Sequence, residues 1–242
     1  MIDLFRPLKL REVELKNRIA VSPMCQYSSR DGFANEWHLV HLGSRAVGGA
    51  ALVMTEATAV SPEGRISIDD LGIWKDDHIG YLKKITDFIL QQHAVPGIQL
   101  AHAGRKSSRT SQWKGDRLLS ISEGGWEAVA PSPIPFSDDT AVPVALTAEG
   151  ISKVISDFQA AAIRAMKAGF RVAEIHAAHG YLVHEFMSPL TNKRTDEFGG
   201  SFGNRIRLLL DIVAAVRSVW PDGYPVFVRI SAIDWRDDGW TL

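Results

Sequence analysis

The sequence predicts an α/β fold built around a parallel sheet, and two observations support this prediction. Short apolar runs rich in β-branched residues alternate along the chain with longer amphipathic stretches of helical periodicity. A loop rich in polar residues follows each apolar run, as is typical of the carboxyl ends of parallel strands. With 242 residues, 45% of them hydrophobic, the chain has ample material for a packed core.

The expected elements follow one another in a regular order after an N-terminal β-hairpin within residues 8–18. Five strands are expected in the apolar runs at residues 18–24, 50–57, 96–103, 172–177 and 226–232. Four helices are expected at residues 35–47, 76–93, 147–169 and 203–220. Thr147 is a suitable N-cap for the third helix, and Gly169 is a suitable residue to end it.

The size of the chain bears on whether the sheet closes. A closed (β/α)8 barrel takes roughly 250 residues, so length alone would allow one. Residues 104–146, rich in Ser, Pro, Gly and Trp, occupy the part of the chain that further strand–helix units would need. We therefore expect a (β/α)8 TIM barrel truncated after about five strands. Residues 1–242 would form one partial domain, with residues 104–146 as an excursion over the barrel mouth.

Composition and charge narrow the possible partners. Lys and Arg total 27 against 28 Asp and Glu, which gives no electrostatic reason to expect nucleic acid or an anionic membrane. The longest apolar run, residues 206–220, is interrupted by Asp211 and Arg217 and does not resemble a membrane span. Cys25 is the single cysteine, which fits a reducing compartment. We expect a cytoplasmic protein with small-molecule partners.

The candidate functional residues fall at the ends of the expected strands. In α/β barrels, reactive groups gather at the carboxyl ends of the strands and in the loops that follow. Polar or reactive side chains occupy such positions after or near the end of four of the five strands. They are Cys25, Tyr27, Gln99, His176, His179, Tyr181 and Arg229.

Three hypotheses compete for the segment "EIHAAHGYLVHEF", residues 174–186, which contains His176, His179 and Tyr181. The two histidines can be ordinary hydrogen-bonded residues at a strand end. They can instead bind zinc with His102 as third ligand, as in a metal-dependent barrel hydrolase. They can also donate to a substrate oxygen that gains negative charge, with the tyrosine as proton donor. The last hypothesis is favoured, because the motif lies where a strand leaves into a turn.

Two further side chains indicate a ligand in the same place. Arg229 cannot be neutralised at ordinary pH, so it needs an anionic or hydrogen-bonding partner. Gln99 adds an amide that both donates and accepts hydrogen bonds. Together with Cys25, these groups suit a flat heterocycle with several carbonyls and ring nitrogens, such as a flavin.

At these residues the chain resembles the old yellow enzyme family of flavin-dependent ene-reductases. The resemblance rests on "LKNRIAVSPMCQY", "TEATAVSPEGR", "GIQLAHAGRK", "EIHAAHGYLVHEFMSPLTNKRTDEFGGSFGNR" and "VRIS", in the family's order and with compatible spacing. The segment "SPMCQYS" resembles the thermophilic-like, xenobiotic-reductase branch. The resemblance implies FMN at the barrel mouth, reduced by NADPH or NADH, and hydride transfer to the β-carbon of an activated alkene such as an enone, an enal or a nitroalkene.

The resemblance also implies a role for each site residue and no metal ligand. Ser22, Pro23 and Met24 would line the flavin through their backbone, with Ala57 nearby. Gln99 and Arg229 would bind its pyrimidine edge, and Cys25 would adjust its redox balance. Tyr27 would close over the substrate, His176 and His179 would bind the substrate oxygen, and Tyr181 would protonate the α-carbon.

In this family the residues that bind the FMN phosphate lie in the loops after strands seven and eight, beyond the five strands expected in this chain. For a full-length protein the resemblance implies a homodimer or homotetramer. The alternative to an active enzyme is that the 242 residues form an inactive or merely structural fragment of a longer protein.

Overall fold

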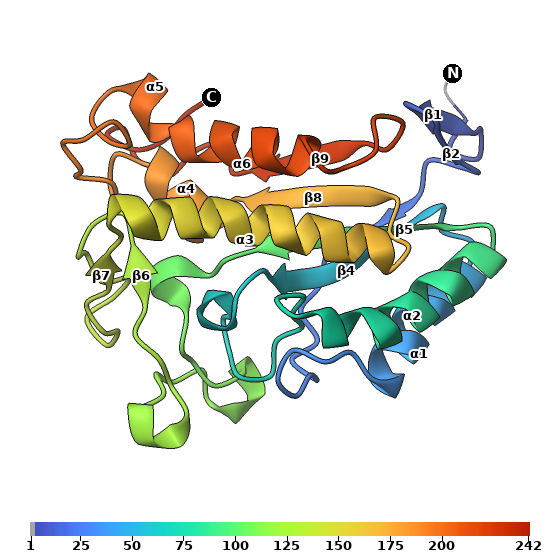
Figure 1. Ribbon diagram of the computed structural model, residues 1–242, viewed down its shortest axis with the longest axis horizontal. Coiled ribbons are helices and arrows are strands. Elements are labelled where there is room, and N and C mark those ends of the chain that lie inside the picture. The colour runs from blue at the N-terminus through green and yellow to red at the C-terminus, as the bar shows by residue number, and fades with distance from the viewer. Residues whose placement is uncertain (1–2) are drawn as a thin grey trace.

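The computed structural model describes residues 3–242, which contain a curled sheet of five parallel strands in the order β3-β4-β5-β8-β9 (Figure 1). The strands are β3 (Ala20–Val21), β4 (Leu52–Ala59), β5 (Val95–Ala101), β8 (Val172–Ala177) and β9 (Val226–Ile230). Every neighbouring pair in this sheet is parallel. The predicted α/β class and the five-stranded partial barrel are confirmed.

Six α-helices lie among residues 3–242: α1 (Glu36–Val47), α2 (Ile79–Gln91), α3 (Ala148–Lys167), α4 (Leu182–Met187), α5 (Phe202–Arg205) and α6 (Arg207–Arg217). The predicted cap of α3 is confirmed, since the Thr147 side chain accepts a hydrogen bond from the Gly150 N–H at 3.1 Å. Gly169 follows the helix with a φ of 92°, which glycine adopts without steric cost. In this described part of the chain, no helix has both the length and the apolar character needed to cross a membrane.

Two local predictions were wrong, and three short elements were not expected. The first strand is confined to Ala20–Val21, because Pro23 has no N–H to continue a ladder, and residues 22–24 leave the sheet. The helix expected at residues 203–220 is broken at Ile206, which caps the end of α5 and precedes α6. Helix α4 and the two short strands β6 (Val129–Ala130) and β7 (Val144–Ala145) were not expected.

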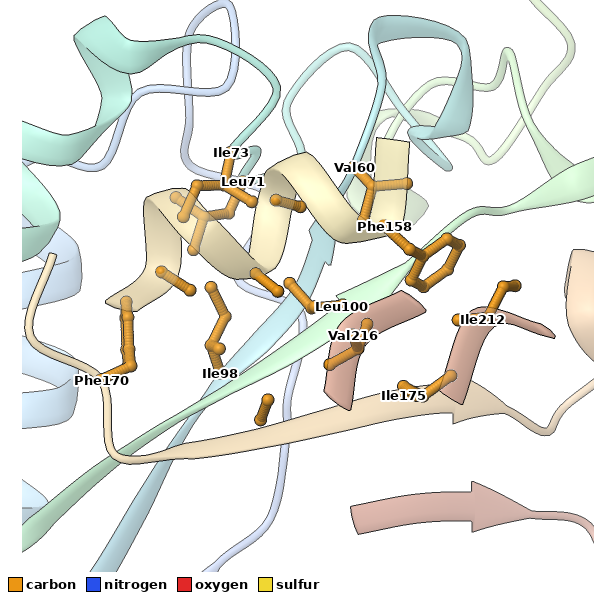
Figure 2. Close-up of a cluster of buried hydrophobic side chains, with 14 of the residues drawn as sticks. Val60, Leu71, Ile73, Ile98, Leu100, Phe158, Phe170, Ile175, Ile212 and Val216 are labelled. Carbon is orange, nitrogen blue, oxygen red and sulfur yellow. The ribbon is translucent and has the colours of Figure 1, made fainter. Parts of the chain in front are cut away.

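The main apolar core lies between the sheet and helices α3 and α6 (Figure 2). Ile98 and Leu100 of β5 and Ile175 of β8 are fully buried together with Phe158 of α3 and Ile212 of α6. Because side chains alternate across a strand, the residues between these positions point to the opposite, concave face of the sheet. Polar residues at those positions are therefore free to form a site.

The N-terminal hairpin and the loops lie at opposite ends of the sheet (Figure 1). The predicted hairpin is confirmed as β1 (Leu8–Leu10) paired antiparallel with β2 (Val13–Leu15), and it packs on a second apolar cluster that includes Leu52 and Val95. At the other end, where the strands point, Figure 1 shows α4, α5 and the segment that contains β6 and β7. The carboxyl ends of the strands are thus surrounded by loops.

Candidate active site

The register of the sheet brings several of the predicted residues into one row. Gln99 of β5 lies opposite Ala57 of β4 on one side and opposite Glu174 of β8 on the other. Further along β8, His176 lies opposite Arg229 of β9. Paired residues of neighbouring strands project on the same face. The register therefore places Ala57, Gln99, His176 and Arg229 on adjacent strands near their carboxyl ends.

Glu174 joins the two predicted flavin-edge residues. Its Oε1 accepts from Gln99 Nε2 at 2.7 Å and from Arg229 Nε at 2.8 Å, and its Oε2 lies 3.5 Å from Arg229 Nη2. Sequence reasoning required an acceptor for Arg229 but did not identify this one. The signal was present in "VAEIHA", where Glu174 precedes His176 by two positions and so shares its face of the strand.

Three aromatic rings meet where β8 ends. The His176 ring centroid lies 5.0 Å from those of both His179 and Tyr181, and each pair is nearly perpendicular. Burial, reinforced by the neighbouring His179 and Arg229, lowers the pKa of His176 to about 3, and burial also lowers the pKa of His179. Burial raises the pKa of Tyr181 well above its usual value. At neutral pH the site therefore presents two uncharged imidazoles and a protonated phenol.

Lys106 contacts this ring cluster from the loop after β5. Its Nζ donates to the His179 carbonyl at 3.0 Å and lies 5.1 Å from the Tyr181 ring centroid. An ammonium group over a ring face is attracted by the ring's quadrupole. Lys106, which was not among the predicted residues, therefore helps to hold the turn that carries both side chains.

The segment after β3 brings Cys25 and Tyr27 to the same end of the sheet. The Cys25 thiol lies beside the Ala57 backbone and the Tyr27 hydroxyl. Burial, reinforced by the negative charges of Asp70 and Glu56, raises the pKa of Cys25 far above its usual value. The thiol is therefore protonated at neutral pH, and a role as thiolate nucleophile is disfavoured.

The Glu56 side chain holds the segment that contains Cys25 and Tyr27 in place. One of its oxygens accepts from the Gln26 backbone N–H at 2.8 Å, and the other lies 3.2 Å from His38 Nε2. The His38 ring, on α1, therefore lies between Glu56 and the N-cap residue Asn35, which it also contacts.

A cavity of about 220 Å³ lies beside Tyr27 and Tyr181. Its other lining residues are Ile66, Lys106, Arg109, Thr110, Gln112, Asp116 and Phe136, most of them from the segment after β5. A larger groove of about 450 Å³ lies between α1 and α2, but it contains none of the predicted site residues. The cavity at the two tyrosines is therefore the candidate substrate site.

The zinc hypothesis is not supported by the geometry. Among residues 3–242 no three His, Cys, Asp or Glu side chains are grouped in a way that could hold a metal ion. The His102 ring accepts from the Gly104 N–H at 3.1 Å through Nδ1 and lies against Gly64. It does not join His176 and His179, so the set of three ligands that the zinc hypothesis requires is not formed.

Comparison with known proteins gives consistent results. The NADPH dehydrogenase of Bacillus cytotoxicus is 51% identical over 242 residues, which cover 99% of this chain and 65% of that protein. The NADPH dehydrogenase of Listeria monocytogenes serotype 4a is 50% identical over 244 residues, covering 100% of this chain and 67% of its own length.

Solved structures show the same relationship. Morphinone reductase matches with a TM-score of 0.83 and 32% identity, over 95% of this chain and 62% of that one. The Old Yellow Enzyme from Pichia sp. AKU4542 matches with a TM-score of 0.84 and 32% identity, over 95% of this chain and 59% of that one. The chain thus spans about two thirds or less of the length of these proteins.

The family model described as NADH:flavin oxidoreductase / NADH oxidase matches residues 3–242, which is nearly the whole chain. The resemblance found in the sequence motifs is therefore confirmed by sequence relatives, by structural neighbours and by the family model together. This chain belongs to the NADH:flavin oxidoreductase / NADH oxidase family.

Proposed function

We propose that this chain carries the active-site residues of an FMN-dependent ene-reductase, which uses NADPH or NADH to reduce an activated alkene such as an enone, an enal or a nitroalkene. The main support is the arrangement of one hydrogen-bonded row, Gln99, Glu174 and Arg229, beside the three rings of His176, His179 and Tyr181. When bound, FMN would supply the transfer of hydride from the nicotinamide to the β-carbon of the alkene.

The residues present fit a flavin ring system. Glu174 fixes the orientation of Gln99 and Arg229, yet 35% of the Arg229 side chain stays exposed and able to donate to a ligand. Ala57, on the neighbouring strand, is small enough to leave room for a flat ring over this row. Residues 22–24 have left the ladder, so the backbone of Ser22, Pro23 and Met24 would line the cofactor, as the resemblance implies.

The two histidines would bind the electron-withdrawing oxygen of the substrate. His176 Nδ1 accepts from the Ala178 N–H at 3.3 Å, so the proton of the neutral ring lies on Nε2, which is then the donor. The neutral state of His179 makes it a second uncharged donor at the same place. Together they would polarise the carbon–carbon double bond by stabilising charge that develops on the oxygen.

Tyr181 would deliver the proton to the α-carbon. Its raised pKa keeps the phenol protonated, and its ring lines the candidate substrate cavity together with Tyr27. Tyr27 would close over the substrate. The protonated Cys25 thiol would influence the flavin's redox balance through hydrogen bonding and polarizability, without forming a covalent intermediate.

The experiment is to record the two half-reactions of the FMN-loaded protein separately in a stopped-flow spectrometer. NADPH should bleach the yellow band, and 2-cyclohexenone should restore it. Tyr181→Phe should bleach at an unchanged rate, with recovery slowed roughly 10²- to 10⁴-fold, the usual contribution of a general acid. Tyr224→Phe, at a tyrosine that packs on Trp220 outside the site, serves as control.

Two outcomes would contradict the proposal. Equal recovery rates in Tyr181→Phe and the wild type would remove the tyrosine from the reaction. A protein that retains no yellow band would favour the alternative of an inactive fragment. We further propose a cytoplasmic location and a homodimer or homotetramer for the full-length enzyme; light scattering on a sizing column measures the latter.

A further inference from the structure

The turn that carries His179 and Tyr181 is held from behind by a residue of α4. The Gly180 backbone N–H donates to His184 Nδ1 at 2.8 Å. Because Nδ1 accepts, the proton of the neutral His184 ring must lie on Nε2. That nitrogen lies 3.0 Å from Asp234 Oδ1, within ion-pair distance of the carboxylate, and both side chains are at least nine-tenths buried.

Asp234 belongs to the segment after β9 and is itself fixed. Its Oδ2 accepts from the Trp240 N–H at 2.8 Å and from the Ser188 hydroxyl at 2.5 Å. The same segment supplies Ser231, whose hydroxyl oxygen accepts from the His179 N–H at 3.0 Å. Both backbone donors at the centre of the turn are therefore satisfied by side chains. The loop that follows β9 supplies one of these acceptors, Ser231, and the carboxylate beside the other, His184.

The turn needs such support because of its backbone conformation. His179 has a φ of 61° and Gly180 a φ of 72°, two successive left-handed residues. A histidine in this region is unfavourable and persists only where the surroundings hold it. The direction in which the His179 and Tyr181 side chains leave the chain depends directly on these two residues.

We propose that His184 and Asp234 are positioning residues for the site. Asp234 selects the Nε2–H tautomer of His184, His184 Nδ1 holds the Gly180 N–H, and the turn keeps the His179 and Tyr181 rings packed on His176. The catalytic consequence rests on the proposed function, whereas the structural link does not. Burial lowers the pKa of His184, which is consistent with a neutral ring in this role.

The test combines nuclear magnetic resonance with the half-reactions described above. In the wild type, ¹⁵N-imidazole spectra should show His184 with an unprotonated Nδ1, and the Gly180 amide should exchange slowly with D₂O. His184→Leu, which has no acceptor, should speed that exchange at least about tenfold and slow recovery by 2-cyclohexenone by roughly 10- to 100-fold, as expected for a misplaced catalytic group. The rate of bleaching by NADPH should be unchanged.

Matched variants separate the positioning role from general damage. His184→Asn keeps an acceptor near the former Nδ1 and should restore part of the protection of Gly180. Asp234→Asn should also speed Gly180 exchange, and it serves as the test if His184→Leu does not fold. In either orientation of the new side chain, its NH₂ group lies against another donor, which is the His184 Nε2–H in one orientation and the Trp240 backbone N–H in the other. His41→Asn, at a half-buried histidine of α1, should leave Gly180 exchange unchanged.

The outcomes distinguish this inference from the proposed function. A protonated Nδ1 in the wild type, or unchanged Gly180 exchange in both His184→Leu and Asp234→Asn, would overturn the positioning role. Faster Gly180 exchange in a protein that reduces no alkene would support the structural link while the proposed function fails. Faster exchange with unchanged recovery by 2-cyclohexenone would overturn the catalytic consequence alone.

Discussion

The guanidinium of Arg229 and the carboxylate of Glu174 form an ion pair on adjacent strands, with 2.8 Å between Nε and Oε1. The same oxygen also accepts from Gln99. The chain therefore supplies its own counter-ion for the arginine that the sequence predicted to need one. A cofactor at this edge would meet two oriented donors, Gln99 and Arg229, with the positive charge of Arg229 balanced by Glu174.

This relationship predicts the effect of Glu174→Gln. The variant leaves Arg229 without its carboxylate, so we expect the free energy of unfolding to fall by about 1–3 kcal/mol, within the range for a charged hydrogen bond. The partial exposure of Arg229 keeps the loss below that of a fully buried pair. Denaturation by urea at pH 7 measures it.

The control is Asp222→Asn, at the fully exposed carboxylate that pairs with Arg217. Exposed pairs contribute little, so this variant should change the free energy of unfolding by less than about 1 kcal/mol. If both variants lower the free energy of unfolding equally, the Glu174–Arg229 pair stabilises the protein no more than an exposed surface pair does.

A second prediction concerns Gly104, at the start of the loop after β5. Its φ is 61°, and a Cβ added there would lie 2.4 Å from Glu185 Oε1. Gly104→Ala should therefore lower the free energy of unfolding by about 2–4 kcal/mol, from the left-handed backbone and from overpacking together. Thermal and urea denaturation give this value.

Gly200→Ala separates the two contributions. Gly200 has a φ of 78°, but no neighbouring atom lies within 4 Å of the place that an added methyl group would take, so only the backbone cost of about 1–2 kcal/mol should remain. If Gly104→Ala costs no more than Gly200→Ala, the close approach of Glu185 is not a constraint.

The alternation of apolar and polar residues explains why the strands and the site could be predicted from the sequence. In the strands within "PGIQLAHA" and "VAEIHA", Ile98, Leu100 and Ile175 face the helices. The alternate residues Gln99, Glu174 and His176 face the concave side, where the register brings them together. Three further features could be predicted from the sequence because each depends on local chemistry: the hairpin, the N-cap at Thr147 and the helix end at Gly169.

The supporting contacts could not be predicted, because they join positions far apart in the sequence. Glu56 contacts Gln26 and His38, and Asp234 contacts His184, across separations that no local pattern encodes. Helix α4 has only six residues, too few for a helical period to be recognised, and the break at Ile206 has no proline or glycine to mark it.

A third prediction follows from Glu185, a fully buried carboxyl group on α4. Burial raises the pKa of Glu185 to about 8, against the opposing effect of Arg105. Between pH 4.5 and 8 the unfolded chain therefore loses a proton that the folded protein keeps, and stability falls as pH rises through this window. Glu185→Gln should remove this fall.

The measurement is the difference in free energy of unfolding between Glu185→Gln and the wild type at pH 5 and at pH 8. The difference should move in favour of the variant by a few kcal/mol between the two pH values, as a large pKa shift requires. Asp70, whose pKa burial raises to about 7, titrates in both proteins and so cancels. A difference independent of pH would mean that Glu185 titrates normally.

The last prediction concerns the reactivity of Cys25. Because burial and the charges of Asp70 and Glu56 raise its pKa, the thiolate fraction at pH 8 is small, and alkylation requires the thiolate. Iodoacetamide should modify the folded protein at least about tenfold more slowly than the urea-unfolded chain, as followed by mass spectrometry.

Glu56→Gln removes one of the negative charges near Cys25 and should speed its alkylation in the folded state. Asp31→Asn, at a carboxylate that does not act on the thiol, should leave the rate unchanged. Rapid alkylation of the folded wild type would show that Cys25 is a reactive thiolate, and a covalent role would then replace the proposed effect on the flavin's redox balance.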